Sequence, residues 1–70
     1  MSVLTVPYRA LTEEPAPDML RDQLVRYTHA PVSVVVLGGE ARFTVSAPVS
    51  TVREAAAFFL DPIGRTWEVE

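Results

Sequence analysis

Residues 2–8 alternate between apolar and polar side chains, which is the pattern of a half-buried β-strand. Leu4, Val6 and Tyr8 share one face of this stretch, and we expect that face to be buried. Pro7 has no amide hydrogen for a strand ladder, so it should lie at a strand end or a bulge. The pattern predicts a first strand over residues 2–8.

The pattern then changes to a helical period. Leu20, Leu24 and Tyr27 recur at i, i+4 and i+7, which places them on one stripe that we expect to be buried. Pro17 suits the first turn of a helix, and Pro31 requires the helix to end before it. A first helix is predicted from the region of residues 12–18 to residues 27–29.

The central stretch from residue 31 to residue 60 is the most informative part of the chain. Val32–Leu37 is apolar on both faces, as in strands that are covered on both sides. Gly38-Gly39 supplies the positive φ angles of a tight hairpin turn. In the returning strand we expect Ala41, Phe43 and Val45 to point inward.

A second helix and a last strand complete the pattern. The helix is predicted over residues 51–60, with an apolar face made of Val52, Ala55, Ala56 and Phe59. Residues 66–70 alternate again and predict a strand in which Trp67 and Val69 point inward.

Polar residues near the helix ends are candidate caps. Thr12 or Asp18 is predicted to cap the first helix, and Thr51 with Glu54 forms a capping-box pattern for the second. His29, the only histidine, is predicted to cap the end of the first helix rather than to act in catalysis.

The predicted order is therefore β-α-β-β-α-β within one domain, residues 1–70. This order predicts an α+β, two-layer sandwich of the ferredoxin-like type. Its usual strand order, 4-1-3-2, places Val32–Leu37 at an open edge of the sheet. Sheet edges are normally protected by charged side chains, and this strand has none. We therefore predict that a second copy or another protein covers it.

A resemblance gives an alternative arrangement. The run Leu37-Gly38-Gly39, Phe43-Thr44-Val45 and Ser50-Thr51-Val52-Arg53-Glu54-Ala55 is similar to the opening of ubiquitin-like sulfur carriers of the β-grasp fold. The resemblance implies a hairpin packed on one helix. An extra strand and helix precede the hairpin here, and residues 67–70 lack the Gly-Gly that carries the sulfur, so we carry over only the fold alternative.

Composition limits the means of stabilisation. A chain of 70 residues buries only about 60% of its unfolded surface, so its stability is marginal. It has no cysteine, so it cannot form a disulfide, and with a single histidine it has too few ligands for a structural zinc site. We therefore expect no metal and no cofactor. A hydrophobic fraction of 49% favours self-association instead.

The charge balance narrows the partners. Nine acids face six arginines that are scattered along the sequence, so no basic stripe predicts direct nucleic-acid binding. No apolar run approaches the roughly 20 residues that span a bilayer, and no signal-peptide pattern is present, so we expect a cytoplasmic protein without a membrane partner.

We interpret the chain as a non-enzymatic, acidic protein-binding module, because no nucleophile–base pair and no catalytic residue can be assigned. We predict that it self-associates, as a homodimer or in a hetero-complex, and that it acts as an inhibitor or adaptor of a protein partner, such as a phage-type antagonist of host defence. The alternatives are a structural subunit of a larger assembly, such as a virion accessory protein, and a small-ligand regulatory domain. The predicted partner-binding residues are apolar (Val32, Val34, Val36, Phe58, Trp67) and acidic (Glu13, Glu14, Asp18).

Overall fold

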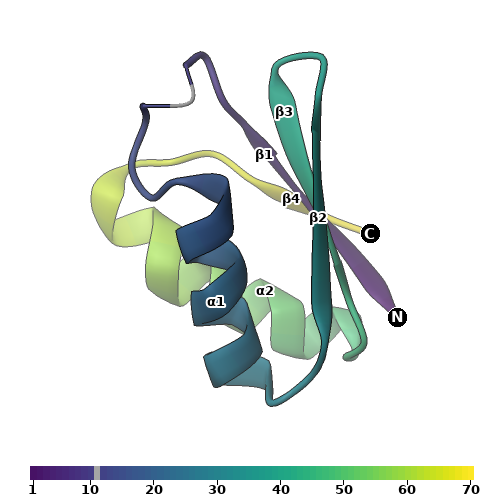
Figure 1. The fold of residues 1–70 in the computed structure, drawn as a ribbon. Helices are drawn as coiled ribbons and strands as arrows, with labels where there is room; N and C mark the ends of the chain where they lie inside the picture. Colours follow the sequence, from purple (N-terminus) through teal and green to yellow (C-terminus); the bar gives the residue numbers. More distant parts are fainter. Residues whose placement is uncertain (11) are drawn as a thin grey trace.

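The chain folds into two layers, a four-stranded sheet and two helices that cover one face of it (Figure 1). The computed structural model describes residues 1–10 and 12–70. The elements are β1 (Ser2–Pro7), α1 (Pro17–Thr28), β2 (Val32–Leu37), β3 (Glu40–Val45), α2 (Val49–Leu60), the short 3-10 helix η1 (Asp61–Ile63) and β4 (Glu68–Val69). The predicted β-α-β-β-α-β order is confirmed. None of the helices in the described ranges has the length and apolar character needed to cross a membrane.

The strand order confirms the ferredoxin-like arrangement. The order across the sheet is β2-β3-β1-β4, which reads 4-1-3-2 from the other edge, and every neighbouring pair is antiparallel. A β-grasp arrangement would need the strand that follows α2 to add directly to the β2–β3 hairpin. Strand β4 pairs with β1 instead, so the β-grasp alternative is wrong.

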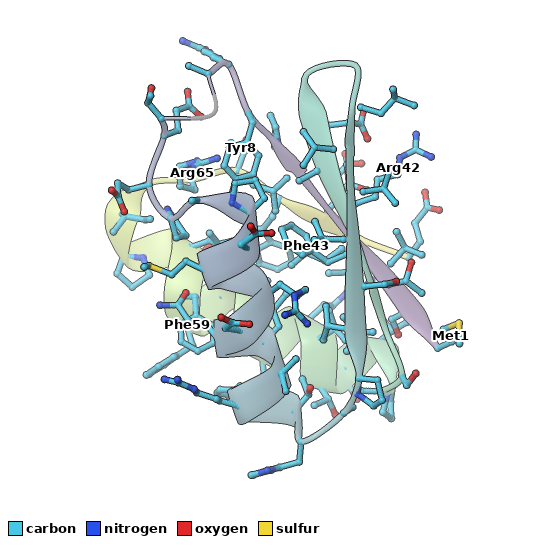
Figure 2. All side chains as sticks on the ribbon, viewed as in Figure 1. Met1, Tyr8, Arg42, Phe43, Phe59 and Arg65 are labelled. Carbon is cyan, nitrogen blue, oxygen red and sulfur yellow. The ribbon has the colours of Figure 1, made fainter. Side chains whose placement is uncertain are left out.

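The core lies between the sheet and the helices, and period-two alternation selects its strand residues. Leu4 lies opposite Phe43, and Val6 opposite Ala41, and all four side chains are fully buried. Phe43 is the largest of the fully buried side chains. Figure 2 shows Phe43 between the layers and Arg42 on the opposite side of the sheet. The helices add the buried residues Leu20, Leu24, Val52, Ala55, Ala56 and Leu60.

The predicted N-terminal caps are wrong. The N-cap of α1 is Ala16 and that of α2 is Pro48, and neither makes a side-chain capping hydrogen bond. Helix α2 begins at Val49, so Thr51 already lies inside its first turn and cannot cap it. His29 does end α1, but through its backbone: its φ is 54°, and its backbone N–H donates to the carbonyl of Val25.

Candidate protein-binding surface

Strand β2 forms one edge of the sheet, and much of it is bare. It pairs with β3 on one side only, in a register that ends with Leu37 opposite Glu40. The exposed fraction is 60% for Val35, 42% for Val36 and 77% for Leu37. Val32, by contrast, is buried in the core. The prediction that another chain covers β2 stays a prediction, because the structure contains a single chain.

Alternation along β2 decides which backbone groups are free. The N–H of Ser46 donates to the carbonyl of Pro31 at 3.2 Å, so the backbone of Pro31 faces β3. Because facing alternates in an antiparallel pair, the backbone groups of Val32, Val34 and Val36 point to the outer edge. The carbonyl of Val32 accepts a hydrogen bond from Arg21 Nη1 at 3.3 Å. The strand groups left for a partner are therefore both backbone groups of Val34 and Val36 and the N–H of Val32.

The side chains on the open face of the sheet continue this edge. Val35 lies opposite Arg42 in the ladder, and Arg42 Nε donates to Glu40 Oε2 at 3.1 Å. A hollow of about 290 Å³ is lined by Val35, Leu37, Gly38, Glu40 and Arg42. The only charges beside the apolar edge in this hollow thus pair with each other, so they present little net charge to a partner.

A second apolar surface lies where α1 meets α2, and we call Tyr27, Phe58 and Phe59 the aromatic patch. Their ring centroids are 5.9 Å (Tyr27–Phe58), 5.8 Å (Tyr27–Phe59) and 5.1 Å (Phe58–Phe59) apart. Phe58 is 64% exposed, whereas Phe59 packs against the core. The prediction that Tyr27 belongs to the buried stripe of α1 is wrong, since it is 37% exposed and packs on the two phenylalanines instead.

Trp67 lies away from the outer edge of β2. It precedes β4, at the opposite edge of the sheet from β2, and packs against the core. Its indole Nε1 donates to Asp61 Oδ1 at 2.8 Å. The structure therefore does not bring Trp67 together with Val34 or Val36.

The three acidic residues predicted to bind a partner differ in their surroundings. Glu13 and Glu14 lie in the connection between β1 and α1, and Asp18 is in the first turn of α1. Glu13 Oε2 lies 3.4 Å from Arg65 Nη2, so this carboxylate is engaged within the chain. Glu14 and Asp18 remain exposed.

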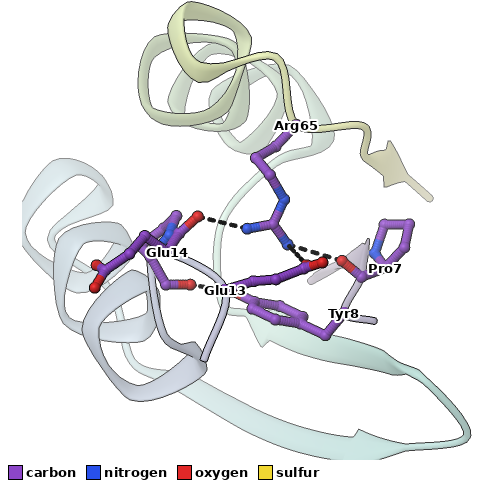
Figure 3. Close-up of polar contacts among 6 residues, drawn as sticks. Pro7, Tyr8, Glu13, Glu14 and Arg65 are labelled. Atoms are coloured by element: carbon purple, nitrogen blue, oxygen red, sulfur yellow. Dashed lines mark hydrogen bonds and ion pairs between the residues drawn. The ribbon is translucent and has the colours of Figure 1, made fainter. Parts of the chain in front are cut away.

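Arg65 makes several polar contacts that no sequence pattern predicted, and we call this group the Arg65 clip (Figure 3). Arg65 donates from Nη1 to the carbonyl of Glu14 at 2.6 Å and from Nη2 to the carbonyl of Pro7 at 2.8 Å. Its Cζ lies 4.6 Å from the centroid of the Tyr8 ring, and its side chain is only 16% exposed. One guanidinium thus joins the end of β1, the β1–α1 connection and the segment before β4.

The clip and the core around it give Tyr8 an unusual environment. The ring is buried, and its hydroxyl donates to the carbonyl of Pro15. Burial raises the pKa of the Tyr8 phenol above its ordinary value of 10.0, although the positive charge of Arg65 acts in the opposite direction.

We expect the domain to lose stability at alkaline pH because of Tyr8. The pKa of Tyr8 is higher in the folded than in the unfolded protein. The stability that the protonated phenol contributes is therefore fully present below the unfolded pKa of 10.0, and it is lost as the pH rises through the folded pKa. Ultraviolet titration of tyrosine ionisation, compared between the wild type and Tyr8→Phe, isolates the Tyr8 transition. A Tyr8 transition at or below pH 10.0 in the folded protein would contradict this prediction.

Four other titratable residues line one hollow at the sheet, namely Glu40, Arg42, Glu68 and Glu70. His29 is exposed at the end of α1. Within residues 1–10 and 12–70, no three His, Asp or Glu side chains lie close enough to hold a metal ion. Comparisons of this chain with protein-family models, curated proteins and solved structures found no match.

Proposed function

We propose that this chain is a non-enzymatic protein-binding module that self-associates by strand addition at the outer edge of β2. The observation that carries the proposal is the combination at that edge: free backbone groups at Val34 and Val36 beside the exposed side chains of Val35 and Leu37. In strand addition, main-chain hydrogen bonds supply affinity and alternate side chains supply specificity.

The two edges of the sheet differ in a way that supports β2 as the binding edge. Strand β4, at the other edge, has only two residues, and it carries Glu68 and is followed by Glu70. Short length and charge are the usual means by which proteins protect a sheet edge. Strand β2 has six residues and contains no charge and no proline. Of the two edges, β2 is therefore the one suited to a partner strand.

The aromatic patch supports a second part of the proposal, a role as an inhibitor or adaptor. Tyr27 and Phe58 are on the helices, whereas the free backbone groups are on β2, so the two surfaces belong to different layers. Exposed aromatic side chains are frequent anchors of protein interfaces. In this proposal the β2 edge joins copies of the chain, and the aromatic patch is available to a different protein.

Sedimentation equilibrium from micromolar to about millimolar concentration tests self-association at β2. We expect a reversible dimer in the wild type and at least a tenfold higher dissociation constant in Val35→Lys, equivalent to about 1.4 kcal/mol, because the ammonium would have to lose water at the interface. Val36→Pro should also weaken the dimer, since it removes an edge N–H without removing a bond to β3.

Phe58→Lys is the matched control. It also introduces a lysine, but in place of an apolar side chain on the helix layer whose exposed fraction, 64%, is close to the 60% of Val35. It should leave dimerisation unchanged, with circular dichroism confirming that all variants fold. A wild type that stays monomeric over the whole range, or a Phe58→Lys variant weakened as much as Val35→Lys, would overturn the proposal.

A further inference from the structure

We infer that the partner strand at β2 is β2 of a second copy, in antiparallel orientation, with a two-fold axis passing at Val35. This inference rests on the proposed function and adds the register of the dimer. It makes one continuous sheet across two chains, in which each copy offers the same residues to the other, as a two-fold interface requires.

The free backbone groups select this register among the neighbouring ones. An axis at Val35 places Val34 of each copy opposite Val36 of the other, so free groups meet free groups, and each of these pairs exchanges two hydrogen bonds. An axis at Val34 would place Val36 opposite Val32, where the guanidinium of Arg21 already occupies the outer edge by donating to the Val32 carbonyl. An axis at Val36 would place Val34 opposite Gly38, which is in the turn with a φ of 62° and does not continue the strand.

The side chains fit the same register. On the open face of the sheet, Val35 faces Val35 of the second copy as a non-hydrogen-bonded pair, in which the Cα atoms lie about 4.5 Å apart. Leu37 faces Ser33 of the second copy. The exposed side chains of Val35 and Leu37 would thus both become more buried in the dimer. Strand β2 itself brings no charged side chain to the contact.

The charges next to β2 do not oppose the pairing. The two Arg42 side chains fall in one row, separated by about three strand spacings or about 14 Å, which exceeds the screening length of about 10 Å at 0.1 M salt. Each Arg42 also keeps its Glu40 partner. On the helix side, Arg21 reaches the edge with Asp22 only 3.1 Å away, so this pair brings little net charge.

The size of the contact sets its strength. The paired segment is residues 33–37 of each copy, whereas a standard stable interface uses roughly 20–30 residues on each side. We therefore expect a dissociation constant in the micromolar range or weaker, and a dimer that forms and dissociates reversibly.

Single-cysteine variants test the register, because the chain has no cysteine of its own. Val34→Cys, Val35→Cys, Val36→Cys and Leu37→Cys are oxidised at a concentration where the wild type is dimeric, and the rate of disulfide-linked dimer formation is measured. A two-fold axis lets only the residue on it meet its own copy, and a Cα separation of about 4.5 Å is within disulfide range. We expect Val35→Cys to cross-link at least tenfold faster than the other three.

Leu37→Cys is the control for random collision, since Leu37 is the most exposed of the four residues replaced. Fastest cross-linking at residue 34 or 36 overturns the register while sedimentation still supports the β2 edge. Equal rates at all four positions in a protein that sedimentation shows to be dimeric overturn the antiparallel pairing of β2 with itself. Failure of the proposed function would instead appear as a wild type that does not sediment as a dimer.

Discussion

Phe43→Ala is expected to lower the free energy of unfolding by about 3–5 kcal/mol. Phe43 is fully buried at the centre of the sheet, opposite Leu4 on one side and Val34 on the other. Truncating a buried phenylalanine to alanine costs about 3–5 kcal/mol, from lost transfer energy and from the cavity that remains. A 70-residue domain has a total free energy of unfolding of only about 4–10 kcal/mol, so the change removes much or all of it.

Urea denaturation followed by circular dichroism measures this effect, and Phe58→Ala is the matched control. Both variants lose the same atoms, but Phe58 is 64% exposed whereas Phe43 is fully buried. We expect Phe58→Ala to change the free energy of unfolding by less than about 1 kcal/mol. Similar urea midpoints for the two variants would mean that Phe43 is not at the centre of the core.

The strands could be predicted because their side-chain period is two and leaves little freedom. A shift of one residue in β3 would turn Ala41, Phe43 and Val45 to the open face, so the alternation fixes both the register and the buried side. The glycines of the β2–β3 turn have φ angles of 62° and 77°, as a tight hairpin turn needs. Local patterns of this kind were sufficient for the fold class and for the position of β2 at an edge.

The helix ends and the exposure of Tyr27 could not be predicted, because they depend on contacts outside the helices. Thr51 matches a capping-box pattern, but Pro48 already holds an extended backbone and α2 begins directly after it. Tyr27 has the spacing of a buried residue, but it lies beside the phenylalanines of α2, and only the packing of the two helices decides which of these rings is covered.

The candidate surface was predicted in part. The apolar run of β2 indicated the edge, but it did not show that Val32 is buried while Val34 and Val36 keep free backbone groups. Val32 belongs to the core, and Arg21 reaches its carbonyl from α1, a contact that no local pattern in β2 reveals. Of the two predicted aromatic partner-binding residues, Phe58 is exposed, whereas Trp67 donates to Asp61 near the other edge of the sheet.

The Arg65 clip could not be found from the sequence at all, because its partners are remote. The guanidinium binds the carbonyls of Glu14 and Pro7, which are 51 and 58 residues away. Backbone carbonyls carry no sequence signature, and all six cations of the chain are arginine. Nothing local distinguishes Arg65 from the exposed Arg42.

Arg65→Met is expected to lower the free energy of unfolding by about 2–3 kcal/mol. Methionine keeps much of the length and apolar stem of arginine but removes the donors, so the carbonyls of Pro7 and Glu14 lose charge-assisted hydrogen bonds, each worth about 1.5–3 kcal/mol and not additive. The contact over the Tyr8 ring, worth about 0.5–1 kcal/mol or more, is lost as well.

Arg42→Met is the matched control, because the Arg42 side chain is itself 67% exposed and makes one ion pair, with Glu40. Such pairs contribute about 0–1 kcal/mol, so the urea midpoint should move little. Arg65→Lys should restore only part of the stability, since one ammonium cannot hold two carbonyls in the fixed geometry of a guanidinium fork. If Arg65→Met were no more costly than Arg42→Met, the β1–α1 connection would be held by the Tyr8 hydroxyl and its bond to Pro15 rather than by the clip.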